Sequence, residues 1–242
     1  IEDVIKTVLK EKVTFTNNHI STKKSHRDLI ADYTKNFKWG KFGIDLALGS
    51  VIDDDATKDD YKFLPDYIFQ AFNNATILSS TNTKPLVKKS KTILKNKPFK
   101  KSKSISDPFY VFLVLSIFIL TITYRNYRNK SRTKWLDFSL YFISGFIGVA
   151  VLLLWFATSH TATYKNFNFL WAFAPNLVAS FYLLKNKLAI WLEYYNWFLL
   201  LLLLSMLILW FVKIQVFSMA LLPLIIALGV RYLFLIYYRN KL

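Results

Sequence analysis

The sequence predicts a polytopic α-helical membrane protein with about five spans, preceded by a smaller, mostly helical soluble part. Residues 108–242 contain 12 basic and only two acidic residues, whereas residues 1–107 contain 20 basic and 13 acidic ones. The second half also holds five apolar stretches of about the length that crosses a bilayer. The two parts of the chain are therefore expected to lie in different solvents.

The composition excludes several classes of site. A net charge of +17 is compatible with nucleic-acid binding, but the basic residues flank apolar stretches, which is typical of membrane proteins, so no nucleic-acid partner is expected. The chain has no cysteine, which rules out disulfides, thiolate metal sites and a cysteine nucleophile within these residues. We expect no cofactor and no metal.

Three helices are predicted in residues 1–83. Apolar residues recur at helical spacing over residues 1–10, over residues 25–37 after a cap near Ser25, and over residues 63–72 with Pro65 in the first turn. Arg27 lies at the start of the second helix, in a role that is either structural or functional. The β-favouring pieces 76–78, 86–87 and 92–94 are compatible with a hairpin.

A glycine-rich segment at residues 39–49 carries one central carboxylate, Asp45. A lone acid among apolar residues usually has a fixed partner, so local pairing is favoured over a functional role. The following acidic cluster, residues 53–60, lacks the spacing, the glycine and the closing glutamate of an EF-hand. It is interpreted as a solvated turn.

Residues 84–107 form a lysine-rich linker, with nine lysines between Lys84 and Lys103. Such a run beside a membrane helix favours contact with anionic lipid headgroups over nucleic-acid binding. The first ten residues have neither the basic nor the apolar region of a signal peptide, and we expect the chain to be the C-terminal part of a longer protein.

The five spans are predicted near residues 108–124, 136–158, 167–184, 188–212 and 214–238. Pro175 and Asn176 lie in the middle of the third, which is expected to be kinked or broken. Ser144 and Gly148, four residues apart, favour a close helix contact. Arg231 is expected to snorkel, and the lack of a deep acid disfavours an ion pump.

The short loops predict the orientation. Nine basic residues (Arg125, Arg128, Lys130, Arg132, Lys134, Lys185, Lys187, Arg239 and Lys241) lie on one side, against Lys165 and Lys213 on the other. The positive-inside rule makes the nine-charge side and the C-terminus cytoplasmic. Residues 1–83 and the polar loop at residues 159–166 are then expected on the opposite face.

The order of motifs resembles one family. Residues 39–49, Asp53, residues 63–67 and Asn74-Ala75 resemble the later part of the DUF4105 domain, and residues 160–170 resemble the membrane-domain signature of the Lnb-type lipoprotein N-acyltransferases of Bacteroidota. That signature has an acidic residue before the histidine, where this chain has Ser159. The resemblance covers nearly the whole chain.

This resemblance implies a papain-like α+β extracytoplasmic domain, of which residues 1–83 would be the C-terminal part, with its cysteine nucleophile upstream. It implies acyl transfer from a phospholipid donor to the α-amino group of a lipoprotein substrate's N-terminal cysteine, at the periplasmic face of the bacterial inner membrane. The substrate-positioning candidates are then His160, Thr161, Asn166 and Asn168, and no catalytic residue lies in this chain. The alternative is a membrane anchor or scaffold of an NlpC/P60-like cysteine hydrolase acting on the cell wall.

Overall fold

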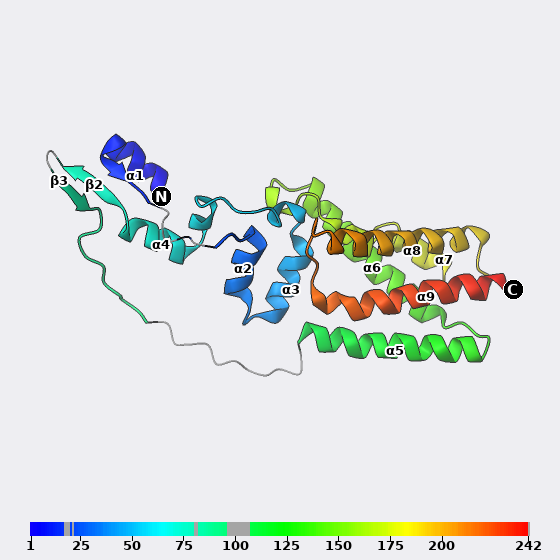
Figure 1. Ribbon diagram of the computed structural model, residues 1–242. Coiled ribbons are helices and arrows are strands. Elements are labelled where there is room, and N and C mark those ends of the chain that lie inside the picture. The colour runs from blue at the N-terminus through cyan, green and yellow to red at the C-terminus, as the bar shows by residue number, and fades with distance from the viewer. Residues whose placement is uncertain (17–19, 21, 80–81, 96–106, 242) are drawn as a thin grey trace. The chain divides into compact units, whose positions relative to one another are not determined.

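The computed structural model describes residues 1–16, 20, 22–79, 82–95 and 107–241. The chain forms two compact units, an N-terminal unit of residues 1–33 and 54–101 and a membrane unit of residues 34–53 and 102–242 (Figure 1). The sequence-based division at residues 84–107 differs from this, because residues 34–53 belong with the membrane helices. Residues 96–106 of the expected linker lie outside the described residues.

The N-terminal unit contains the helices α1 (Glu2–Leu9), α2 (His26–Thr34) and α4 (Pro65–Asn73), with the 3-10 turns η1 (Lys10–Lys12) and η3 (Asp60–Phe63). At the start of α2, the Asp28 N–H donates to Ser25 Oγ over 3.1 Å and the Ser25 N–H donates to the Asp28 carboxylate over 3.2 Å. These reciprocal bonds form a capping box and explain why the helix begins there. Pro65 is the first residue of α4, where its missing N–H costs no hydrogen bond.

A three-stranded antiparallel sheet accompanies these helices. Its order is β1 (Val13–Thr14), β2 (Thr76–Ser79) and β3 (Asn82–Pro85), with Ile77 opposite Lys84. The predicted hairpin is present, but its second strand lies at residues 82–85 rather than 86–94. The core of the unit consists of Ile20, Leu29, Ala56, Tyr61 and Leu64, with Tyr67 packed against it.

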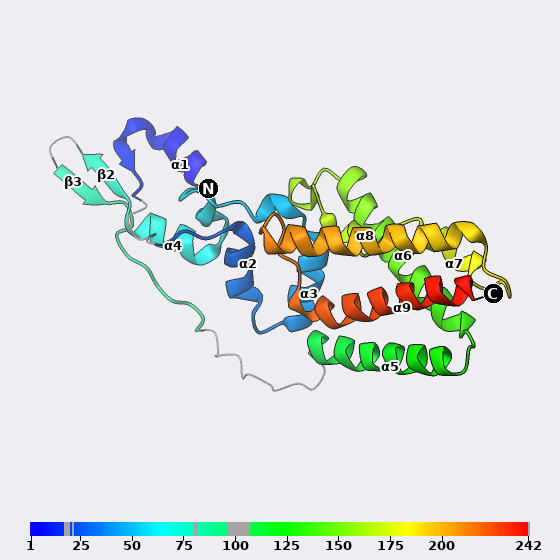
Figure 2. The same ribbon diagram turned by 45° about the vertical axis from the view of Figure 1, so that its right-hand side comes forward.

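Four long helices dominate the membrane unit: α5 (Pro108–Arg128), α6 (Lys134–Phe156), α8 (Ile190–Phe211) and α9 (Leu222–Asn240), the last preceded by the 3-10 turn η6 (Met219–Leu221). Each is long and apolar enough to cross a membrane. Helix α9 packs between α5 and α8 (Figures 1 and 2). The unit also holds α3 (Lys38–Ala47) and the turn η2 (Ser50–Ile52).

The third predicted span is not a continuous helix. It consists of the turn η5 (Phe167–Leu170), an irregular stretch and the short helix α7 (Asn176–Tyr182). This broken segment runs antiparallel along α6: the Phe169 ring lies 6.1 Å from Trp155 near one end, and an Arg132 Nη donates to the Leu183 carbonyl over 2.8 Å at the other. The third predicted span therefore lies along α6 without forming a long helix.

Glycines on α6 permit this close packing. A Cβ on Gly148 would lie 1.9 Å from the Ala172 carbonyl oxygen, and one on Gly145 would lie 2.1 Å from the Leu177 nitrogen. Ser144 accepts a hydrogen bond from Asn176 Nδ2 over 3.0 Å, so the close contact predicted at Ser144 and Gly148 is present. These contacts cover the broken segment, whose backbone N–H and C=O groups are not all paired within a helix.

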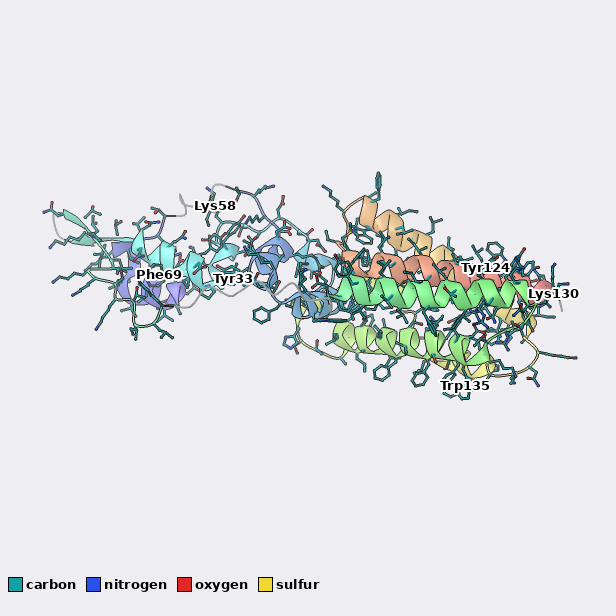
Figure 3. All side chains as sticks on the ribbon, turned by 90° about the horizontal axis from the view of Figure 1, so that it is seen from below. Tyr33, Lys58, Phe69, Tyr124, Lys130 and Trp135 are labelled. Atoms are coloured by element: carbon teal, nitrogen blue, oxygen red, sulfur yellow. The ribbon has the colours of Figure 1, made fainter. Side chains whose placement is uncertain are left out.

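The fifth predicted span begins later than expected. Its helical part starts at Met219, and residues 214–218 are irregular because Gln215 turns inward and is fully buried. We call the end of the bundle where α6 and α8 finish the loop end, and the end where α5 and α9 finish the basic end. Tyr124, Lys130 and Trp135 lie at the basic end (Figure 3).

Candidate functional site

The candidate site is the polar loop that follows α6 at the loop end. It begins with the 3-10 turn η4 (Thr161–Thr163). Thr163 Oγ1 lies 2.7 Å from the carbonyl oxygens of Leu154 and His160, which ties the loop back onto the last turn of α6. Lys165 adopts a left-handed backbone with φ of 51°, which turns the chain toward η5. The loop therefore has a defined conformation.

Two asparagines of this loop bind the C-terminal end of α3. Asn166 Nδ2 donates to the carbonyls of Leu46 over 2.9 Å and Ala47 over 3.0 Å, and Asn168 Nδ2 donates to the Asp45 carbonyl over 3.1 Å. The last carbonyls of a helix have no partner within it. The side-chain amides supply those partners, and we call this arrangement the amide latch.

The latch is supported from a third segment. Gln215 Oε1 accepts from the Phe167 N–H over 2.8 Å, and Asn168 Oδ1 accepts from the Trp171 indole N–H over 3.0 Å. The two asparagines are also joined, since Asn166 Oδ1 accepts from Asn168 Nδ2 over 2.9 Å. Asn166, Asn168 and Gln215 are all fully buried. Their orientation is therefore fixed by bonds on several sides.

Backbone contacts extend the latch beyond α3. The Gly49 N–H donates to the Ala162 carbonyl and the Ser50 N–H donates to the Lys165 carbonyl, each over 3.0 Å. A Cβ on Gly49 would lie 1.8 Å from the Tyr164 carbonyl oxygen. Only glycine fits this approach without a shift of one of the two backbones. The glycine-rich segment thus serves as a contact surface for the loop.

The four candidate positioning residues separate into two pairs. His160 and Thr161 are exposed, whereas Asn166 and Asn168 are buried with their amide groups engaged in the latch. The exposed pair lies beside the latch. The buried pair binds the end of α3, a partner that the sequence pattern does not indicate.

Asp45 and Arg27 are both buried. Asp45 accepts from Lys41 Nζ over 2.7 Å, one helical turn away, and this is the local pairing that the sequence favoured. Its carbonyl belongs to the latch as well. Arg27 lies in the first turn of α2 in the N-terminal unit.

A buried charge cluster lies toward the basic end of the bundle. Asp137 and Arg231 are fully buried, with Arg231 Nε 2.7 Å from Asp137 Oδ1 and an Arg132 Nη 3.1 Å from Asp137 Oδ2. Nη1 of Arg231 donates to Thr123 Oγ1 over 3.1 Å and to Asn126 Oδ1 over 3.0 Å. The cluster joins α5, α6 and α9.

This cluster corrects two expectations. Arg231 does not snorkel, because a carboxylate within the bundle binds it, and its guanidinium also lies 4.6 Å from the centre of the Phe234 ring. Arg132, one of the nine basic residues expected in the short loops, also has a buried side chain. The sequence pattern that indicates this pairing is an arginine within one apolar stretch and an aspartate at the start of another, because charges within a membrane usually pair.

A second polar layer lies between the cluster and the loop end. The Tyr141 hydroxyl donates to Asn196 Oδ1 and the Tyr195 hydroxyl donates to Asn176 Oδ1, each over 2.5 Å. Asn176 in turn donates to Ser144. These bonds fix the broken segment to α6 and α8 at the point where Pro175 interrupts it.

The described residues contain no group of three or more potential metal ligands. In the N-terminal unit, Ser25 Oγ accepts a hydrogen bond as a helix cap, and His26 Nε2 lies 4.0 Å from Asp60. This is the helix cap that the sequence predicts near Ser25.

Residues 100–241 match the family model of the Lnb transmembrane domain. No curated protein and no solved structure matches the chain. The matched range includes all four long helices, the candidate loop and the buried charge cluster.

Proposed function

This chain belongs to the Lnb transmembrane domain family, and on that premise we propose that it is the membrane-embedded part of a lipoprotein N-acyltransferase. The enzyme would move an acyl chain from a phospholipid to the α-amino group of a lipoprotein's N-terminal cysteine. The observation that carries the proposal is the family match over residues 100–241. The likeness of residues 39–75 to a DUF4105 domain of Bacteroidota supports it.

In the proposed reaction, a cysteine thiolate outside residues 1–242 attacks the donor's ester carbonyl. The lysophospholipid leaves as its alcohol after taking a proton, and a thioester remains. The lipoprotein's amine then attacks the thioester, loses a proton to a base, and releases the thiolate. Two substrates anchored in one leaflet would meet this centre at a fixed height, which favours reaction by proximity.

The contribution of this chain would be the amide latch and the exposed residues beside it. The latch fixes residues 45–50 against the loop, and His160 and Thr161 remain exposed on it. We propose that these two side chains bind polar groups of a substrate, and that the loop faces the periplasm at the inner membrane. The C-terminus would then be cytoplasmic.

The full-length protein, given phospholipid and a diacylated lipopeptide, tests the activity by mass spectrometry of the product. His160→Ala should lower the rate by about tenfold or more if the side chain positions a substrate, because misplacement of a reacting group is costly. Ser159→Ala, an exposed neighbour, is the matched control. Equal rates for both variants at equal protein level would favour the anchor role, and no product from the wild type would refute the acyltransferase.

The orientation has a separate test, because a chain without cysteine accepts single labels. Ser159 and Ser131 are both exposed, at the loop end and the basic end respectively. An impermeant thiol reagent should label Ser159→Cys when only the periplasmic face is accessible, and Ser131→Cys only after the membrane is opened. The reverse pattern would refute the proposed topology.

A further inference from the structure

A groove runs between α5 and α6, two helices that follow each other in the chain but are held apart. Helix α5 packs on α9, and α6 packs on the broken segment with α7. The space between them has a volume of about 460 Å³, within the range of small-molecule sites. Leu224 and Leu228 of α9 contribute to its lining.

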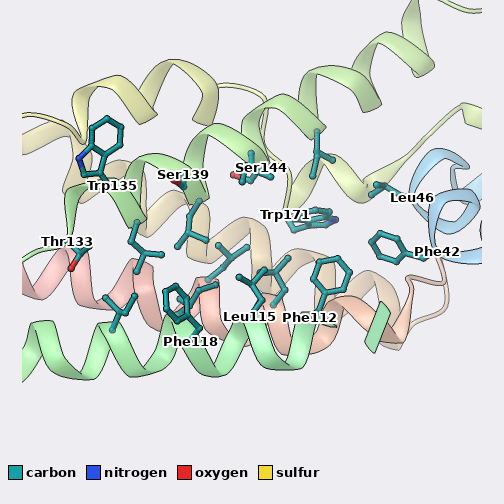
Figure 4. A pocket seen from close by; sticks show the side chains of 18 residues that line it. Phe42, Leu46, Phe112, Leu115, Phe118, Thr133, Trp135, Ser139, Ser144 and Trp171 are labelled. Atoms are coloured by element: carbon teal, nitrogen blue, oxygen red, sulfur yellow. The ribbon is translucent and has the colours of Figure 1, made fainter. Parts of the chain in front are cut away.

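The lining is almost wholly apolar (Figure 4). Helix α5 contributes Phe112, Leu115, Phe118, Ile119 and Ile122, and α6 contributes mainly Leu136, Leu140, Ile143 and Ile147. Among the described residues that line it, the hydroxyl side chains are those of Thr133, Ser139 and Ser144. Because the groove lies between two helices long enough to span a membrane, its lining favours an aliphatic occupant over water.

The dimensions fit one acyl chain. Residues 112–122 of α5 and 136–147 of α6 follow the groove for roughly 15 Å, at about 1.5 Å per residue. That is about half of the ~30 Å hydrocarbon core, which is the depth that the acyl chains of one leaflet occupy.

The end of the groove nearest the loop is lined in part by residues of the amide latch. Phe42, Leu46 and Trp171 lie together there (Figure 4). Asn168 holds two of them, because its Oδ1 accepts from the Trp171 indole and its Nδ2 lies 3.2 Å from the Leu46 carbonyl oxygen. The candidate loop and the groove therefore share one wall.

Charges at this end indicate the headgroup. Lys38, Phe42 and Leu46 follow each other at intervals of four residues, so Lys38 lies on the same face of α3 as the two lining residues. Its ammonium pairs with Asp107, the residue before α5, and its side chain is 59% exposed. Lys41 Nζ pairs with Asp45 over 2.7 Å, and its side chain is 37% exposed. An ammonium group has three N–H donors, so each lysine can keep its carboxylate partner and still donate to a phosphodiester beside the groove.

We propose that the groove between α5 and α6 binds one acyl chain of a phospholipid, with its phosphate at Lys38 and Lys41, and that this lipid is the acyl donor. The inference rests on the proposed function for the donor's role, and it names the site where the donor is held. Asn168 is then a positioning residue, which acts through Leu46 and Trp171.

The test fills the groove from either wall. Ile143→Trp on α6 and Leu115→Trp on α5 place an indole in it, whereas Phe146→Trp and Val114→Trp change exposed neighbours that do not line it. The full-length protein is purified in detergent, and native mass spectrometry measures the binding of added phosphatidylglycerol. Both groove variants should bind at least about tenfold less lipid than their controls, since contact with several methylenes is lost.

Two further arms identify the ligand. Lys38→Gln should weaken phosphatidylglycerol binding several-fold, and Lys187→Gln, an exposed lysine at the basic end, should not. A diacylated lipopeptide or a free fatty acid that competes as well as phosphatidylglycerol would overturn the assignment of a phospholipid. Equal lipid loss in the groove variants and their controls would overturn the groove itself.

The same variants separate this inference from the proposed function. N-acylation at the wild-type rate by variants that have lost the bound lipid would overturn the donor site and leave the acyltransferase standing. Groove-dependent lipid binding in a wild-type protein that makes no N-acylated product would overturn the acyltransferase and leave a phospholipid site.

Discussion

The two ends of the membrane unit hold buried polar groups in different ways. At the loop end, the latch joins the neutral amides of Asn166 and Asn168 to backbone carbonyls, and Gln215 Oε1 accepts from the Phe167 N–H. Toward the basic end, Asp137 joins two arginines by ionic contacts. Neutral hydrogen bonds each contribute little net stability but leave a moderate penalty when broken, whereas an unpaired buried charge is far more costly. The bundle should therefore tolerate changes in the latch better than changes in the cluster.

The largest effect is expected from Asp137→Ala, which leaves Arg132 and Arg231 as uncompensated buried charges. Removal of one partner from a buried pair costs about 3–5 kcal/mol. The thermal unfolding midpoint in detergent should fall steeply, and Arg128→Ala, an exposed arginine at the same end, should leave it nearly unchanged. A second variant, Asp137→Leu with Arg231→Met, should recover part of the loss. Similar midpoints for Asp137→Ala and the control would show that the ionic contacts of Asp137 do not stabilise the bundle.

Gly49→Ala should rank next, because its Cβ would overlap the Tyr164 carbonyl. Overpacking of a close contact costs about 1–3 kcal/mol. The expected result is a lower unfolding midpoint together with faster hydrogen exchange in residues 158–170. Gly43→Ala is the matched control, because its Cβ would meet nothing within 4 Å. Replacement of a glycine by alanine inside a helix tends to stabilise that helix. Equal exchange in the two variants would contradict a latch at this position.

Asn168→Leu should have a smaller effect, because it removes neutral hydrogen bonds and introduces no buried charge. The side-chain size is nearly kept, but a leucine cannot donate to the Asp45 carbonyl. Loss of a buried donor costs about 1–3 kcal/mol. The variant should unfold earlier than Asn186→Leu, whose asparagine is exposed at the basic end. The intrinsic tryptophan fluorescence should also shift, because the Trp171 indole loses its acceptor on Asn168; an unchanged spectrum and midpoint would argue against the latch.

The smallest effect concerns pH, outside the membrane part. Burial raises the pKa of Glu2, but hydrogen bonds from Lys6 and Lys62 outweigh it and the net pKa is lowered; bonds from Thr57 lower the pKa of Asp60. A carboxyl with a lowered folded-state pKa stabilises the fold above its ordinary value, near pH 4, and this is lost as pH falls through the folded value. Hydrogen exchange in residues 1–16 and 54–79 should quicken there, less steeply in Glu2→Gln. The side chains that form the latch bonds are amides, which do not titrate, so hydrogen exchange in the latch should not follow this profile.

The amino-acid sequence determined the membrane class, because apolar runs and flanking charges are local properties that bilayer thickness selects directly. It also located the helices at residues 2–9, 26–34 and 65–73, whose caps and periodicity lie within a few residues of each other. The break at Pro175 followed from the missing N–H alone.

Only the tertiary structure decided which polar residues are available. His160 and Asn166 lie in one polar loop and look equivalent in sequence, yet one is exposed and the other is buried against carbonyls more than a hundred residues away. Asp137 and Arg231, which pair with each other, lie 94 residues apart in the sequence. A hydrogen bond depends on where two segments meet in space, and periodicity along one segment carries no information about its partner.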